Sequence, residues 1–159
     1  MKKIIFDNPY ERKNVIKDND EIYNIENHYS YIEKLYNNID FSYNKIITRE
    51  LKKKFYSYKS QDKKKNKFDE ENHITYEELI KKLYDSKLKC YYCNEDLCIM
   101  YTGKNESMQW SLERFDNNIG HYDNNTCISC FKCNVTRRTD SHEYFKMGKQ
   151  LKINKINES

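Results

Sequence analysis

The chain contains two cysteine pairs with the spacing Cys-x-x-Cys, namely Cys90-Tyr91-Tyr92-Cys93 and Cys130-Phe131-Lys132-Cys133. Each pair presents two thiolates from one tight turn, and two pairs make the usual ligand set of a structural zinc ion. Cys127 stands three residues before Cys130, so either neighbouring pair has the required spacing. We favour Cys130 with Cys133, because Cys127 falls inside a predicted strand. The sequence therefore predicts zinc at Cys90, Cys93, Cys130 and Cys133, with Cys98 and Cys127 as reduced structural thiols.

The residues between the two pairs predict a β-hairpin. Polar and apolar side chains alternate over residues 109–115, which is typical of a strand, with Glu113 on its polar face. Residues 116–124 read as a turn, and residues 125–129 as the returning strand. A helix then begins at the second cysteine pair and runs over residues 130–138.

Further helices are expected on both sides of this segment. Apolar residues recur at helical spacing over residues 21–37 and 44–58. A third helix begins at Thr75, which can form a capping box with Glu78. A last helix is expected over residues 141–151.

This order of elements predicts an α+β chain in three parts. Residues 1–72 would form a helical, lysine-rich extension, residues 73–140 a zinc-binding module, and residues 141–159 a C-terminal helix and tail. The chain has 159 residues, of which 37% are hydrophobic. It is therefore long enough for one small domain with an extension, and metal binding would supply folding free energy that a small core lacks.

Positive charge is concentrated between Lys45 and Lys67, where ten Lys or Arg residues stand against two acidic ones. We expect Ser60–Lys67 to form a basic loop. A solvated lysine-rich face is one interpretation of this run. The other is a phosphate-contacting surface whose affinity falls with salt. The candidate nucleic-acid contacts are Lys52, Lys53, Lys63, Lys64 and Lys65.

The sequence does not predict a membrane partner, because it contains neither an apolar run of signal-peptide length nor a membrane-spanning segment. Six cysteines without a secretory signal are more typical of metal ligands than of disulfides. We therefore expect an intracellular, reducing compartment.

A resemblance to a known family rests on Glu113-Arg114, Asn125 and Cys130-x-x-Cys133-Asn134. In this order they resemble the HNH (ββα-metal, treble-clef) endonucleases. The resemblance is closest to zinc-containing endonuclease VII-like proteins and to HNH-like proteins of large DNA viruses and phages. It covers residues 75–138 and implies a zinc turn, a β-hairpin and a helix that carries two zinc ligands. For a viral protein, the compartment would be the infected-cell cytoplasm, the nucleus or the virion.

The resemblance also implies a catalytic site. Glu113 and Asn134 would hold Mg²⁺ or Mn²⁺, and one carboxylate with one amide oxygen suits such hard ions. Asn125 would orient the hairpin and the general base. A plain strand carboxylate paired to Lys or Arg is the alternative interpretation of Glu113.

One position departs from the family pattern. Arg114 stands where a histidine normally activates water, and a guanidinium cannot accept a proton at physiological pH. His121 is the candidate base, although it could equally hold the hairpin turn. Arg114, Arg137 and Arg138 are candidate phosphate clamps. Solvated cations at a helix C-terminus are the alternative for Arg137 and Arg138.

Two classes of function follow from this resemblance. The first is a zinc-containing, Mg²⁺- or Mn²⁺-dependent endonuclease acting on double-stranded or branched DNA. Junction-resolving relatives act as dimers, so a homodimer is an expectation. The second is a catalytically inactive zinc module that binds DNA or RNA, or a structural nucleic-acid-associated viral protein. The carboxylate of Glu113 favours the first class, and Arg114 favours the second.

Overall fold

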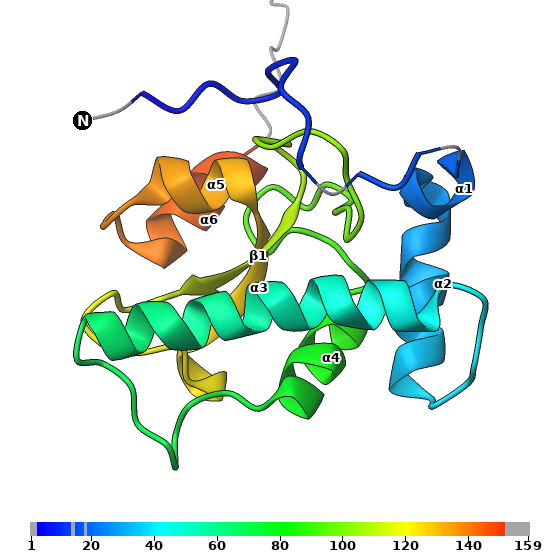
Figure 1. Ribbon diagram of the computed structural model, residues 1–159. Coiled ribbons are helices and arrows are strands. Elements are labelled where there is room, and N and C mark those ends of the chain that lie inside the picture. Colours follow the sequence, from blue (N-terminus) through cyan, green and yellow to red (C-terminus); the bar gives the residue numbers. More distant parts are fainter. Residues whose placement is uncertain (1–2, 14, 18, 152–159) are drawn as a thin grey trace, which may run out of the picture.

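The computed structural model describes residues 3–13, 15–17 and 19–151. Within them the chain is α+β, with six α-helices around one antiparallel pair of strands (Figure 1). In chain order the elements are α1 (Asp20–Tyr23), α2 (Ile25–Tyr36), α3 (Asn44–Lys64), α4 (Tyr76–Asp85), β1 (Trp110–Arg114), β2 (Thr126–Cys130), α5 (Phe131–Arg137) and α6 (His142–Gln150).

The predicted hairpin is confirmed. Strands β1 and β2 pair in antiparallel register from Trp110 opposite Cys130 to Arg114 opposite Thr126. A short 3₁₀ turn, Asp123–Asn125, leads into β2. The alternation along β1 gives the hairpin two different faces, because successive side chains of a strand point to opposite sides.

One face of the hairpin packs against α3. The hydroxyl of Tyr58 accepts a hydrogen bond from the backbone N–H of Leu112 at 3.1 Å, and its ring lies 6.2 Å from that of Trp110. The other face meets α5, where Asn134 donates to the hydroxyl of Ser111 at 3.1 Å. The hairpin therefore lies between α3 and α5, and each of these helices contacts a different set of β1 residues.

Helix α3 is longer than predicted, and the expectation of a basic loop from Ser60 is wrong up to Lys64. Its buried stripe continues past Tyr58 to Asp62, which has no exposed surface. The apolar pattern ends at Tyr58 in the sequence because a carboxylate occupies the next inward position. In the structure that carboxylate is buried by accepting hydrogen bonds from the hairpin loop.

Two other helix predictions have different outcomes. The helix expected over residues 21–37 is divided into α1 and α2, because the side chain of Asn24 accepts from the N–H of Glu26 and caps a new helix start. The capping box of α4 is confirmed. Thr75 accepts from the N–H of Glu78 at 3.2 Å, and Glu78 accepts from the N–H of Thr75 at 2.8 Å.

The hydrophobic core joins segments from the first two of the three predicted parts. Ile22 of α1, Leu51 of α3, Leu83 of α4 and Leu112 of β1 belong to one cluster of buried side chains. Helix α6 has no buried residue, but Phe145 packs edge-on against Tyr92 with ring centroids 5.0 Å apart. Among the described residues, no helix combines the length and apolarity needed to cross a membrane.

Candidate functional site

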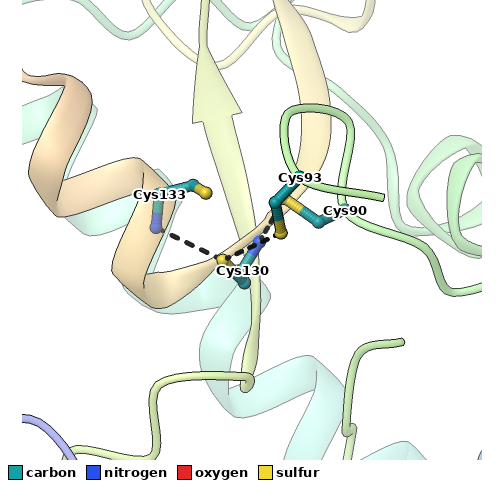
Figure 2. Close-up of side chains that lie close together, drawn as sticks. All are labelled: Cys90, Cys93, Cys130 and Cys133. Atoms are coloured by element: carbon teal, nitrogen blue, oxygen red, sulfur yellow. Dashed lines mark hydrogen bonds between the residues drawn. The ribbon is translucent and has the colours of Figure 1, made fainter. Parts of the chain in front are cut away.

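The four predicted zinc ligands converge at one point (Figure 2). Cys90 and Cys93 lie in the turn after α4, Cys130 ends β2, and Cys133 lies in the first turn of α5. Their four sulfur atoms all lie within 4.8 Å of one another. The Sγ atoms of Cys93 and Cys130 are 4.0 Å apart. A zinc ion with Zn–S bonds of about 2.3 Å requires ligands this close, so the cluster fits a tetrahedral metal.

Backbone amides support the thiolate form of these ligands. The N–H of Cys130 donates to the sulfur of Cys90 at 3.2 Å, and the N–H of Cys133 donates to the sulfur of Cys130 at 3.2 Å. Hydrogen bonds among the sulfur atoms lower the pKa of Cys90 and raise the pKa of Cys130 and of Cys133. The two backbone donors and the mutual closeness of the four sulfurs, rather than these pKa shifts, are what suit a structural metal bound by thiolates.

Cys98 and Cys127 lie outside the cluster, as predicted. Both are buried, and burial raises the pKa of each thiol, for Cys98 to about 12. They therefore remain protonated and pack as small apolar side chains. Among the described residues, the four-cysteine cluster is the one group of at least three His, Cys, Asp or Glu side chains close enough to share a metal ion.

Glu113 lies on the α5 face of the hairpin and is only 3% exposed. Its Oε1 atom accepts a hydrogen bond from Arg137 at 3.0 Å, while its Oε2 atom is buried without a hydrogen-bond partner. Burial raises the pKa of Glu113 to about 7, against the opposing effect of Arg137. An unpartnered buried carboxylate oxygen is costly, and such groups concentrate at functional sites.

Asn134 lies on the same side of β1 as this carboxylate. It follows Cys133 on α5 and hydrogen-bonds to Ser111, which precedes Glu113 by two residues on the same strand face. The structure thus brings the two predicted ligands of a hard metal ion to one interface between β1 and α5. The unpartnered oxygen of Glu113 and the amide oxygen of Asn134 are the donor types that Mg²⁺ and Mn²⁺ prefer.

Arg137 is an interior residue, which corrects its assignment as a phosphate clamp. It is 2% exposed, and its guanidinium donates to Glu113 and to three backbone carbonyls. These carbonyls belong to Arg114 at 2.7 Å, Phe115 at 2.6 Å and Asp140 at 2.8 Å. The guanidinium of Arg137 therefore uses its N–H donors to connect α5 to the end of β1. It is not exposed at the surface, where a phosphate would bind.

Arg114 points to the opposite face of the hairpin from Glu113. Its guanidinium lies 3.8 Å from a carboxylate oxygen of Asp62 and donates to the carbonyl of Ile119 at 3.3 Å, and its side chain is 12% exposed. Strand alternation therefore separates Arg114 from Glu113, although the two are neighbours in sequence. Arg138 is exposed and remains free to contact a ligand at the end of α5.

His121 is not placed to act as the general base, and its alternative interpretation as a turn-holding residue is right. The ring is 3% exposed and lies on the α3 face, with its centroid 4.8 Å from that of Tyr58. Its Nδ1 atom is 2.8 Å from one oxygen of Asp62, and its backbone N–H donates to the other oxygen at 2.6 Å. Asp62 therefore anchors the hairpin loop to the end of α3, on the far side of the hairpin from Glu113.

Asn125 orients the hairpin, as the family pattern implies. Its side-chain oxygen accepts from the N–H of Asp116 at 3.0 Å. Its amide group donates to the carbonyls of Asp116 at 2.9 Å and of Gly120 at 3.1 Å. These bonds close the loop between β1 and β2.

The candidate lysine contacts are all exposed. Lys52, Lys53, Lys63 and Lys64 lie on α3, and Lys65 is its C-cap residue. Lys53 lies 3.5 Å from Glu50. The sequence does not reveal Asp62 as the buried partner of His121, because a single acid inside a lysine run gives no local sign of burial.

In comparisons with models of protein families, with curated proteins and with solved structures, this chain matches none of them.

Proposed function

We propose that the chain is a zinc-stabilised, HNH-like endonuclease that hydrolyses phosphodiester bonds of DNA with a divalent metal ion. In this proposal the zinc turn, hairpin and α5 form a treble-clef ββα-metal module. The observation that carries it is the unpartnered, buried Oε2 atom of Glu113 at the same interface as Asn134. A protein that only binds nucleic acid has no need for a desolvated carboxylate at this point.

The surrounding residues support a holding role for this pair. Arg137 holds one oxygen of Glu113 and leaves the other free, while Ser111 fixes the amide of Asn134. Partners of this kind orient ligands and are typical of metal sites. Bound Mg²⁺ or Mn²⁺ would polarise the phosphoryl oxygen and stabilise the leaving oxyanion. Exposed lysines of α3 and Arg138 would bind the phosphate backbone.

A second candidate function is a zinc module that binds nucleic acid without cleaving it. The ion pair between Arg137 and Glu113 favours it, because a guanidinium already neutralises the carboxylate. The lack of a suitable general base also favours this function. Arg114 cannot accept a proton, and His121 contacts Asp62 on the α3 face of the hairpin, away from Glu113.

Cleavage assays with purified, zinc-loaded protein separate the two functions. Mg²⁺ or Mn²⁺ should support nicking of duplex or branched DNA. Glu113→Gln and Asn134→Ala should each lower the rate by about 100-fold or more, because removal of an electrostatic stabiliser typically has an effect of this size. Zinc content and DNA affinity should stay near the wild-type values. Glu95→Gln, at an exposed carboxylate beside the zinc turn, is the matched control.

The opposite result would replace the endonuclease with the binding module. If full-length protein with complete zinc occupancy binds DNA but does not cleave duplex, single-stranded or branched substrates with either metal, Glu113 is a structural partner of Arg137. Retention of cleavage in Glu113→Gln would also remove this residue from the proposed site.

A further inference from the structure

A basic hollow lies along α3, away from the zinc cluster and the Glu113 site. It is a shallow depression of about 560 Å³ that is wide open to solvent, and the cationic residues Lys45, Arg49, Lys52 and Lys53 line it together with Asn44, Thr48 and Tyr56. No carboxylate belongs to its lining among the described residues. Lys45, Arg49, Lys52 and Tyr56 are spaced by four, three and four residues, so they share one line along the helix.

Two of these cations have no internal counter-charge. Glu50 lies 3.7 Å from Arg49 and 3.5 Å from Lys53, but its nearest partner is Arg12 at 3.0 Å. Within the described part of the chain, no carboxylate forms an ion pair with Lys45 or Lys52. The hollow therefore keeps a net positive charge that only an external anion can neutralise.

Tyr56 gives this surface a second property. It is 56% exposed, although a ring of this size is normally covered by other apolar groups. Its neighbour Phe55 is buried and packs edge-on against it with centroids 5.4 Å apart, which supports the ring from one side. The free side of Tyr56 is thus available for stacking, with cations next to it.

Two rings from the chain that follows α3 lie beside further cations of this helix. Lys52 lies over the ring of Tyr76 at 5.1 Å. Further along, Lys59 and Lys63 lie over Phe68 at 5.2 and 5.0 Å. This interleaving is typical of surfaces that bind single strands, where bases stack on rings and phosphates meet cations. A duplex hides the faces of its bases, so it would use only the cations.

We propose that this face of α3 binds single-stranded nucleic acid, with a base stacked on Tyr56 and phosphate groups on Lys45, Arg49 and Lys52. The inference rests on the proposed function in one respect, which is that the substrate is a nucleic acid. It adds that the part of the substrate bound by α3 is single-stranded. Because α3 covers the hairpin face opposite to Glu113, the bound strand lies apart from the proposed hydrolytic site. The surface would hold an unpaired arm of a branched substrate.

Fluorescence anisotropy with labelled oligothymidine and a duplex of equal length tests this inference on the full, zinc-loaded chain. Tyr56→Ala should weaken single-strand binding by about tenfold or more, the fold-change that corresponds to loss of one stacked base. Duplex binding should change by less than about twofold. Tyr56→Phe should retain single-strand binding, because the ring stacks without its hydroxyl. Tyr144→Ala, at a tyrosine of α6 that is 76% exposed, is the matched control and should bind as the wild type does.

The salt dependence tests the phosphate contacts separately. Lys45→Gln combined with Lys52→Gln should reduce the slope of log affinity against log salt by about 1.4 on a single strand, at about 0.7 for each phosphate contact. Both side chains are at the surface, so circular dichroism should show an unchanged fold.

Three outcomes would overturn the inference. If the lysine variants weaken duplex binding while Tyr56→Ala has no effect, α3 contacts duplex DNA and the proposed function stands. If polyglutamate competes as well as oligothymidine does at equal charge, the face is a general polyanion surface. If neither variant changes binding to any nucleic acid while Glu113→Gln still abolishes cleavage, α3 is solvated surface and only the hydrolytic site remains.

Discussion

Gly120 lies where the hairpin loop touches the end of α3. A Cβ atom at this position would collide with the carbonyl oxygen of Lys67 and approach a carboxylate oxygen of Asp62 to 2.8 Å. We therefore expect Gly120→Ala to lower the free energy of unfolding by about 1–3 kcal/mol, as overpacking does. Urea unfolding would measure it. Gly148→Ala in α6 is the control, because a Cβ there meets no atom within 4 Å and replaces a helical glycine. If the two variants have equal free energies of unfolding, lack of space for a Cβ atom is not the reason for a glycine at position 120.

The buried pair of His121 and Asp62 gives the protein a pH dependence. Burial lowers the pKa of His121 to about 4, although Asp62 acts in the opposite direction. Because an unfolded histidine titrates near 6.5, the unfolded chain binds more protons between these two values. The contribution of His121 to stability should therefore fall as the pH decreases from about 6.5 toward about 4, and this contribution should be fully present above 6.5.

A variant isolates this contribution from those of other groups. The stability advantage of the wild type over His121→Asn should shrink between pH 7 and pH 5, as followed by urea unfolding with zinc content monitored at each pH. An advantage that stays constant over this range would mean that the ring does not titrate in this way.

At the scale of elements, the four-cysteine cluster joins parts that are weak alone. Helix α5 has seven residues, and a two-stranded hairpin is marginally stable in water. Structural zinc contributes on the order of 10 kcal/mol of apparent folding free energy. We expect Cys93→Ser, Cys133→Ser or removal of zinc by a chelator to unfold residues 88–140. Circular dichroism and zinc stoichiometry measure this.

The control for this prediction is Cys98→Ser. This thiol is buried outside the cluster, so the variant should bind zinc in the wild-type ratio. If Cys133→Ser lacks zinc but remains folded, zinc binding does not contribute to the stability of residues 88–140.

At the scale of the whole molecule, α3 connects the N-terminal helices to the hairpin. Leu51 has no exposed surface and shares one hydrophobic cluster with Leu112 of β1. Leu51→Ala should lower the free energy of unfolding by about 2–5 kcal/mol, the range for buried leucines. It should also reduce hydrogen-exchange protection of the β1 and β2 amides, because one core unfolds cooperatively.

An exposed position of the same helix provides the comparison. Lys64→Ala should leave both quantities within about 0.5 kcal/mol of the wild type. If Leu51→Ala destabilises α3 but leaves the hairpin amides protected, residues 1–72 and 73–140 are independent folding units.

Several features follow from the sequence alone, because they depend on spacing within a few residues. The four cysteines of the cluster are marked by two Cys-x-x-Cys turns, and the strand alternation separates Glu113 from Leu112. The capping box at Thr75 requires only that Glu78 stand three residues later. In each case the local backbone geometry decides which side chains meet.

The roles of the charged residues were decided only by the tertiary structure. Asp62 lies 59 residues before His121, and Arg137 lies 24 residues after Glu113, so no local pattern pairs them. The same long-range contacts extend α3 to Lys64, bury Arg137 and turn His121 away from Glu113. The physical reason is desolvation. Whether a charge is buried depends on what the fold brings against it, and a charge removed from water must be paired by whichever group the fold supplies.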